Sequence, residues 1–239
     1  NGGVLTTAGV TQVSGNILAD GGGDVSLAGQ LTVLGDVSMI NSAAKLTVGP
    51  STTLTSLKTQ SFGDVIIRGS VGSIESISSK ALTVNGGRVS PGELKTLSAT
   101  GQLTLCGAVL NGGLSVLESS AAVRAVVSTS CAASTIAGSI SIEKGAGAVT
   151  FDGALTSASD LKVIERTGNV VLRRLTLSDV LLEKITGNLQ IVASQIDSDV
   201  SIQLVTGSAL LSEINTAGDL SINSISAGLT ISNGDFGSE

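Results

Sequence analysis

The chain has 239 residues and a formal net charge of −6, and 41% of its residues are hydrophobic, yet only 1% are aromatic and none is histidine, tryptophan or tyrosine. The negative charge and the lack of aromatic stacking residues argue against a nucleic-acid partner. The absence of histidine excludes Ser-His-Asp and Cys-His catalytic systems and zinc sites built on histidine. Apolar stretches are far shorter than the roughly 20 residues needed to cross a bilayer, so we expect no membrane span.

Short segments with an apolar, polar, apolar pattern recur along the whole chain. Because such alternation has the period of a β-strand with one buried side, each segment is predicted to be a strand. No segment has a convincing helical period. The predicted strands begin at residues 25, 31, 46, 82, 103, 114, 140, 149, 175, 189, 200, 220 and 229, where the sequence is VSL, LTV, LTV, LTV, LTL, LSV, ISI, VTF, LTL, LQI, VSI, LSI and LTI.

The strands return at a regular interval. The strand at 189 has a counterpart at 229, the strand at 200 has one at 220, and glycines recur at nearly equal intervals at Gly147, Gly168, Gly187, Gly207 and Gly228. A fixed period of this length is typical of a solenoid, in which each turn covers the apolar side of the turn before it. The sequence therefore predicts an all-β, single-stranded, right-handed parallel β-helix with coils of about 20 residues.

This β-helix is expected to run as one solenoid through residues 1–239, with the repeat clearest from 140 to 239. Hairpin-built sheets are the alternative, because the DG at 152 and the NG at 233 are hairpin turns. Hairpins do not require equally spaced glycines, which favours the solenoid. With strands ~4.8 Å apart, about 12 coils would give a rod on the order of 55 Å long.

The two cysteines, Cys106 and Cys131, are separated by slightly more than one repeat. This separation allows them to lie on neighbouring turns and to form a disulfide. The alternative is two free, buried thiols that behave as small apolar residues.

Four aspartates each immediately precede an apolar strand, so a solenoid would stack them in a column: Asp160, Asp179, Asp199 and Asp219. We expect these carboxylates to accept hydrogen bonds from backbone N–H groups at a bend. A row of calcium ions that relieves their repulsion is the alternative. The DGGGD segment at 20–24 resembles one calcium-binding nonapeptide turn, but the tandem copies that such sites require are missing.

Candidate carbohydrate chemistry rests on charged residues in the C-terminal half. Asp197 and Asp199 are two residues apart and can share a face, while Arg173 and Arg174 lie about one coil earlier. Such a site would be consistent with a carbohydrate-active β-helix, although a solvated strand face is the simpler interpretation and no Trp or Tyr offers a stacking surface. We therefore assign no catalytic residue, cofactor-binding residue or metal ligand, and we expect a protein that is not an enzyme and needs no cofactor.

A third possibility is a flat array of hydroxyl groups that orders water, as in ice-binding solenoids. Its candidate residues share an outward position in the strand pattern and are Thr32, Thr47, Thr83, Thr104, Thr176 and Thr230. Each is a single hydroxyl residue flanked by buried aliphatic residues, whereas such arrays use two threonines per strand.

The ends bear on the expected partners. The chain begins with Asn rather than Met, and neither end has the pattern of an amphipathic helix that would cap a solenoid. We therefore expect a portion of a longer β-helix, or copies that stack end to end.

The phrases TGNLQI, AGDLSI and SGNIL resemble the coils of filamentous-haemagglutinin-type adhesins and autotransporter passengers. The secretion signature of that family is not visible in this chain. The resemblance implies an elongated structural or adhesive module at the cell surface or outside the cell, with a surface glycan or a protein as a possible partner. A carbohydrate-binding or carbohydrate-active β-helix is the alternative function.

Overall fold

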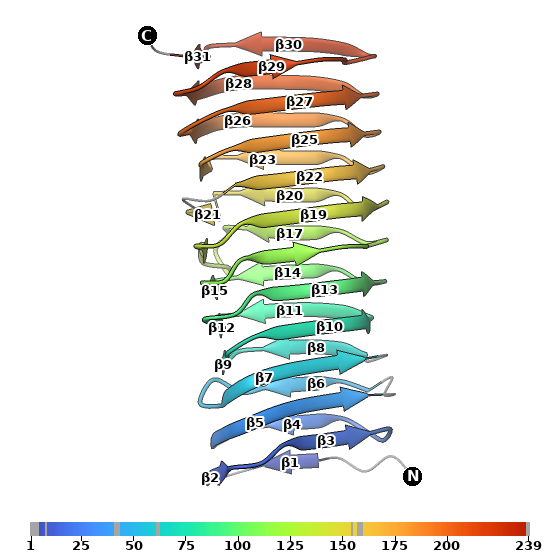
Figure 1. Cartoon of the computed structure of the whole chain (residues 1–239), viewed down its shortest axis with the longest axis vertical. Helices are drawn as coiled ribbons and strands as arrows, with labels where there is room; N and C mark the ends of the chain where they lie inside the picture. The colour runs from blue at the N-terminus through green and yellow to red at the C-terminus, as the bar shows by residue number, and fades with distance from the viewer. Residues whose placement is uncertain are drawn as a thin grey trace.

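The computed structural model describes residues 5–7, 9–40, 44–60, 63–153, 155–156 and 160–237. These residues form 31 β-strands and no helix. Every pair of named strands is parallel, and the strands stack along one long axis with the two termini at opposite ends (Figure 1). The predicted all-β parallel solenoid is confirmed, and its right-handed sense stays a prediction.

Each coil contributes a strand to three faces, which we number in chain order. The first face contains β1 (Leu5–Thr7), β4 (Val25–Leu27), β6 (Leu46–Val48), β8 (Asp64–Ile67), β11 (Ala81–Asn85), β14 (Leu103–Cys106), β17 (Val123–Val126), β20 (Val149–Asp152), β23 (Val170–Arg173) and β30 (Gly228–Ser232). The short second face contains β2 (Val10–Val13), β9 (Ser70–Val71), β12 (Arg88–Val89), β15 (Val109–Leu110), β18 (Ser134–Ile136), β21 (Leu155–Thr156), β24 (Thr176–Leu177) and β31 (Asp235–Phe236).

The third face lies towards the viewer in Figure 1. It contains β3 (Ile17–Asp20), β10 (Ile74–Ser79), β13 (Leu94–Ala99), β16 (Leu114–Val116), β19 (Ile140–Gly145), β22 (Leu161–Arg166), β25 (Val180–Ile185), β27 (Val200–Val205) and β29 (Leu220–Ile222). Four longer strands bend from one face into the next: β5 (Gln30–Ile40), β7 (Thr53–Gln60), β26 (Leu189–Ile196) and β28 (Ser208–Thr216).

The ladder of the first face makes eleven steps from Leu5 to Leu229. Nine of these steps, such as that from Leu189 to Ala209, have nearly equal lengths, which confirms the predicted coil of about 20 residues. The step from Val65 to Leu82 is shorter, and the step from Val123 to Val149 is longer. These two irregular coils, the short coil and the long coil, explain why the repeat is harder to see before residue 140.

Aliphatic side chains fill the narrow interior, because alternate residues of every strand point inward. Successive coils stack these side chains in columns, such as Leu105, Ala125, Phe151 and Leu172, all of which are 0% exposed. The small Ala125 lies between the large Leu105 and Phe151, which leaves space for the aromatic ring.

Four of the five evenly spaced glycines form a column at one corner of the solenoid. A Cβ on Gly187 would lie 2.5 Å from the carbonyl oxygen of Gly168, and Gly168 and Gly207 meet the coil before them in the same way. Glycine recurs here because the stacked backbones approach too closely for a side chain. Gly228 is the exception, since it aligns with Ser208 rather than with Gly207.

Two columns of non-glycine residues also turn through the left-handed region, one just before the glycine column and one at the bend between the first and second faces. Among the described residues, eight non-glycine residues have positive φ, and the ladder register places them in two columns: Lys144, Glu165, Lys184 and Leu204, and Arg174, Ala193, Glu213 and Asn233. In the first column Lys184 Nζ lies 3.0 Å from Glu165 Oε1. This contact lowers the pKa of Glu165 and raises the pKa of Lys184.

The long coil carries an inserted loop, residues 127–133, between β17 and β18. Cys131 in this loop forms a disulfide with Cys106 at the end of β14 in the preceding coil, with 5.0 Å between the two Cα atoms. The prediction that the cysteines lie on neighbouring turns is confirmed, and the disulfide replaces the alternative of two free thiols.

The interior also holds one arginine, Arg166, whose side chain is 0% exposed. Its guanidinium donates to the carbonyl oxygens of Ser119 at 3.1 Å, Lys144 at 2.9 Å and Gly147 at 2.5 Å. Burial lowers the pKa of Arg166. Because backbone carbonyls surround its cation, Arg166 ties three successive coils together.

Candidate functional site

The predicted aspartate column is present at the corner between the second and third faces. The backbone N–H of Asp199 donates to Asp179 Oδ1 at 2.9 Å, and the N–H of Asp219 donates to Asp199 Oδ1 at 2.8 Å. The carboxylates of Asp179 and Asp199 therefore accept backbone N–H groups, as expected, but each N–H belongs to the next coil. Within the described ranges, no group of three or more His, Cys, Asp or Glu residues is arranged to hold a metal ion.

The same contact recurs in the DGGGD segment, where Asp24 Oδ1 accepts from the backbone N–H of Lys45 at 2.9 Å. Asparagine does this elsewhere, since Asn188 N donates to Asn169 Oδ1 at 2.9 Å and Ser208 N donates to Asn188 Oδ1 at 3.0 Å. An uncharged side-chain oxygen thus makes the same contact as a carboxylate at a stacked corner.

We expect the substitution Asp179→Asn to make folding less sensitive to acid. The hydrogen bond from the backbone of Asp199 lowers the pKa of Asp179. Stability from a carboxyl with a lowered pKa is present above its unfolded value and is lost as the pH falls through its folded value. Asparagine keeps the acceptor without titrating, so the variant should differ from wild type by no more than about 0.5 kcal/mol at neutral pH. Urea unfolding at neutral pH and near pH 3 measures the difference.

Asp197→Asn is the matched control, because the Asp197 side chain makes no hydrogen bond among the described residues. It should lose as much stability in acid as wild type does. If Asp179→Asn lost equally as much, the proposed role of the stacked hydrogen bond would be wrong.

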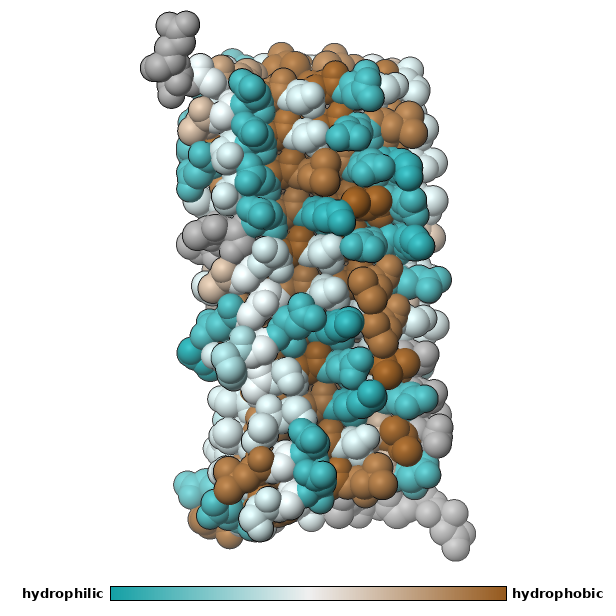
Figure 2. Space-filling view, viewed as in Figure 1, coloured by the Kyte–Doolittle hydropathy of each residue, from teal (hydrophilic) through white to brown (hydrophobic). Residues whose placement is uncertain are grey.

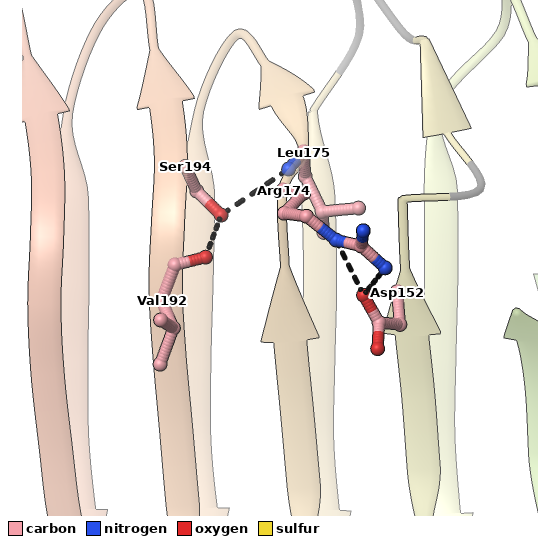
Figure 3. Close-up of polar contacts among 5 residues, drawn as sticks. All are labelled: Asp152, Arg174, Leu175, Val192 and Ser194. Carbon is pink, nitrogen blue, oxygen red and sulfur yellow. Dashed lines mark hydrogen bonds and ion pairs between the residues drawn. The ribbon is translucent and has the colours of Figure 1, made fainter. Parts of the chain in front are cut away.

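The candidate carbohydrate site does not assemble. Arg174 donates to Asp152 Oδ1 through Nε at 3.0 Å, at the corner between the first and second faces (Figure 3). Arg173 donates to Gln190 Oε1 at 2.6 Å. Asp197 and Asp199 lie at the corner on the other side of the second face, where Asp199 belongs to the aspartate column. The short second face therefore separates the two arginines from the two aspartates.

At the same corner, a serine side chain forms hydrogen bonds with two backbone groups. Ser194 Oγ donates to the carbonyl oxygen of Val192 at 3.0 Å and accepts from the backbone N–H of Leu175 at 3.3 Å (Figure 3). Ser194 thus stabilises the turn beside the ion pair of Arg174 and Asp152.

The six threonines do not form one flat array. Thr47, Thr83, Thr104 and Thr230 lie in one outward column of the first face, whereas Thr32 and Thr176 lie on the second face. The column of the first face is also interrupted, for example by Ile66 between Thr47 and Thr83. The arrangement does not support an ice-binding surface.

The third face carries a hollow that the sequence did not predict. Its volume is about 340 Å³, and its polar lining residues are Asp36, Ser38, Ser56, Lys58, Ser73 and Glu75. Ser56 Oγ donates to Asp36 Oδ1 at 2.6 Å, and Lys58 Nζ lies 3.2 Å from Glu75 Oε2. Two carboxylates, one ammonium group and three hydroxyl groups therefore face one hollow.

This set of donors and acceptors suits a polar ligand rich in hydroxyl groups. The regular period of the sequence did not predict this hollow, for a geometric reason. Lys58 and Glu75 are ladder partners across the short coil, so they are closer in the sequence than the regular period would place them. A search for a shorter spacing at this one coil would have paired them.

The fold defines the class of the protein as a three-sided parallel β-solenoid. Comparisons of the chain with protein-family models, curated proteins and solved structures found no match. Among the described residues, no helix has the length and apolar character needed to span a membrane.

Proposed function

We propose that the protein is a non-enzymatic structural or adhesive β-solenoid module that works outside the cell as a spacer, filament subunit or presentation rod. The observation that carries this proposal is that outward polar side chains pair with one another between neighbouring coils. Pairs such as Lys58 and Glu75, Glu165 and Lys184, and Ser212 and Ser232 connect one coil to the next. Hydrophilic side chains accordingly gather in strips along the long axis (Figure 2).

The disulfide supports the extracellular part of the proposal. Disulfides such as that between Cys106 and Cys131 persist mainly in oxidising compartments. The repeat phrases that resemble those of surface adhesins point in the same direction.

A distance measured along the long axis tests whether the solenoid is a rigid rod. Spin labels at Ser26→Cys and Thr230→Cys would lie on the same outward column, ten ladder steps apart. At ~4.8 Å per step, pulsed electron spin resonance should give a narrow distribution near ~48 Å. A broad distribution would overturn the spacer function, and release of reducing sugar from a polysaccharide panel would overturn the non-enzymatic assignment.

The hollow on the third face favours a second candidate function, carbohydrate binding. On a glycan array, Glu75→Gln should then lose signal, because it removes the carboxylate that faces Lys58. Glu93→Gln is the control, since Glu93 is exposed and does not line the hollow. Equal signals from both variants would remove this candidate.

We further propose that copies associate end to end, the alternative being a longer chain whose further coils would cover the same surfaces. Leu229 and Ile231 of β30 are each 44% exposed, whereas Ala209 and Leu211, their ladder partners one coil earlier, are 2% and 0% exposed. Apolar side chains gather at this end in Figure 2. At the opposite end, the inward residues Val13, Ile17 and Ala19 are also incompletely buried. Stacking one end on the other would cover both apolar surfaces and pair the strand edges.

The substitution Ile231→Lys is expected to weaken this association at least tenfold, which corresponds to about 1.4 kcal/mol. The ammonium group would have to enter the apolar contact. Sedimentation over a range of concentrations measures the effect. Thr230→Lys adds the same charge on the outward side of the same strand and should leave association nearly unchanged. A wild-type protein that stays monomeric at the highest concentration would contradict the proposal.

A further inference from the structure

The long coil builds a second hollow, which lies on the first face beside the disulfide. Its volume is about 150 Å³, and it is lined by Gln102, Thr104, Arg124, Val126, Ser128 and Cys131, together with Leu105. Thr104 and Arg124 are ladder partners on β14 and β17, while Ser128 and Cys131 belong to the inserted loop. The loop therefore forms one wall of a hollow whose floor is the outer surface of the first face.

The disulfide and two backbone bonds fix this wall. Ser128 N donates to the carbonyl oxygen of Cys131 at 2.9 Å, and Cys131 N donates to that of Ser128 at 3.2 Å. The loop is thus closed on itself and held to Cys106 of the preceding coil. Because the loop is held by its own backbone bonds and by the disulfide to the preceding coil, it loses little conformational freedom when a ligand binds.

Arg124 is the charged residue of this hollow, and its guanidinium has no partner among the described residues. Its ladder neighbours Thr104 and Thr150 are uncharged. Asp152 follows Thr150 by two residues on the neighbouring strand β20. Its Oδ1 already accepts two hydrogen bonds from Arg174. The N–H groups of Arg124 therefore remain available in a protein whose net charge is −6.

An arginine with free N–H groups matches a carboxylate, which accepts two parallel hydrogen bonds from it. Gln102 and Thr104 add an amide and a hydroxyl group, which suit sugar hydroxyls. The Ser128 hydroxyl is already hydrogen-bonded to Ser130 within the loop. Val126 and the disulfide supply an apolar surface for the C–H groups of a sugar ring.

We propose that this hollow binds a carboxylate-bearing sugar residue, with the carboxylate on Arg124. The proposal rests on the adhesive role proposed above and names the class of ligand for it. Because the disulfide holds the wall, the site is complete only in the oxidised protein.

Isothermal titration and ligand-observed NMR with the whole oxidised chain test the proposal, with D-glucuronate as the probe and D-glucose as its neutral counterpart. We expect glucuronate to bind at least tenfold more tightly than glucose. Arg124→Gln should weaken glucuronate binding at least tenfold, and reduction of the disulfide should weaken it as well. Arg88→Gln, an exposed arginine on the second face, should not change it.

Three results would overturn the proposal: equal binding of glucose, unchanged binding by Arg124→Gln, or equal binding of an N-acetylated aspartate amide, which would assign the hollow to acidic peptides. Gln102→Ala is a second variant that leaves the charge intact, and a loss of binding in it supports the site independently of Arg124. If glucuronate does not bind while the spin-label distance stays near the expected ~48 Å, the sugar site is wrong and the rod function stands.

Discussion

Replacing Gly187 with alanine is expected to lower the free energy of unfolding by about 2 to 3 kcal/mol, as overpacking of a close contact does. The new Cβ would lie 2.5 Å from the carbonyl oxygen of Gly168 and 2.7 Å from the backbone nitrogen of Asn169. Both are backbone atoms of the neighbouring coil, so the contact can be relieved only by separating two rungs of the ladder. Urea unfolding followed by circular dichroism measures the loss.

Gly15→Ala provides a matched control. Nothing lies within 4 Å of a Cβ built on Gly15, and its φ is not in the left-handed region. Alanine should be tolerated there or should stabilise slightly, since it restricts the unfolded chain. If both variants were equally stable, close stacking would not be the reason for the glycine column.

The position of Gly187 in the stack also predicts which coils the substitution should destabilise. In a solenoid each coil contacts only its neighbours, so stability is approximately a sum of local terms. Gly187→Ala should therefore accelerate amide hydrogen exchange most in the coils next to it, from β23 to β28, and least in β4 to β8. Uniform acceleration along the chain would show that the solenoid unfolds as a single cooperative unit.

Replacing Phe151 with alanine is expected to cost about 3 to 5 kcal/mol, the usual range for a buried aromatic residue. Phe151 is 0% exposed and stacks between Ala125 and Leu172. Rungs that are bonded on both sides cannot collapse into the space that the ring leaves, so a cavity remains. Thr150→Ala, on the outward side of the same strand, should change stability by no more than about 0.5 kcal/mol.

A double variant tests the packing of the column itself. Ala125→Leu alone should destabilise by about 1 to 3 kcal/mol, because Phe151 fills the adjacent space. Combined with Phe151→Ala, the same leucine should recover part of the lost stability. Additive losses in the double variant would mean that the two side chains do not share one space.

The positions of the strands were predictable because the buried sides of a solenoid repeat locally. The strands at 189 and 200 were expected from a short apolar, polar, apolar alternation, and β26 and β27 begin at these residues. The stacking of Asp179 and Asp199 followed from the same period. The period could not predict which backbone N–H group donates to each carboxylate, since that group belongs to the next coil.

The candidate sites were harder to predict because they depend on the coils that break the period. The hollow at Lys58 lies at the short coil, and the hollow at Arg124 lies at the long coil. A charged residue in either coil looks like an ordinary solvated residue in the sequence. The predicted grouping of Arg173 with Asp197 failed for the related reason that one coil bends at three corners, which a linear spacing does not locate.

The sequence by itself determined the parallel stack, its regular coil length and its aliphatic interior, because alternation along a strand and repetition between coils are both written in the order of residues. Tertiary structure alone decided the three faces, the left-handed turns at Glu165 and Lys184, and the burial of Arg166 among carbonyl oxygens. It also decided the disulfide and the free guanidinium of Arg124 beside it. These features depend on which residues of different coils meet at a corner, and that meeting is set by the packed backbones rather than by any local pattern.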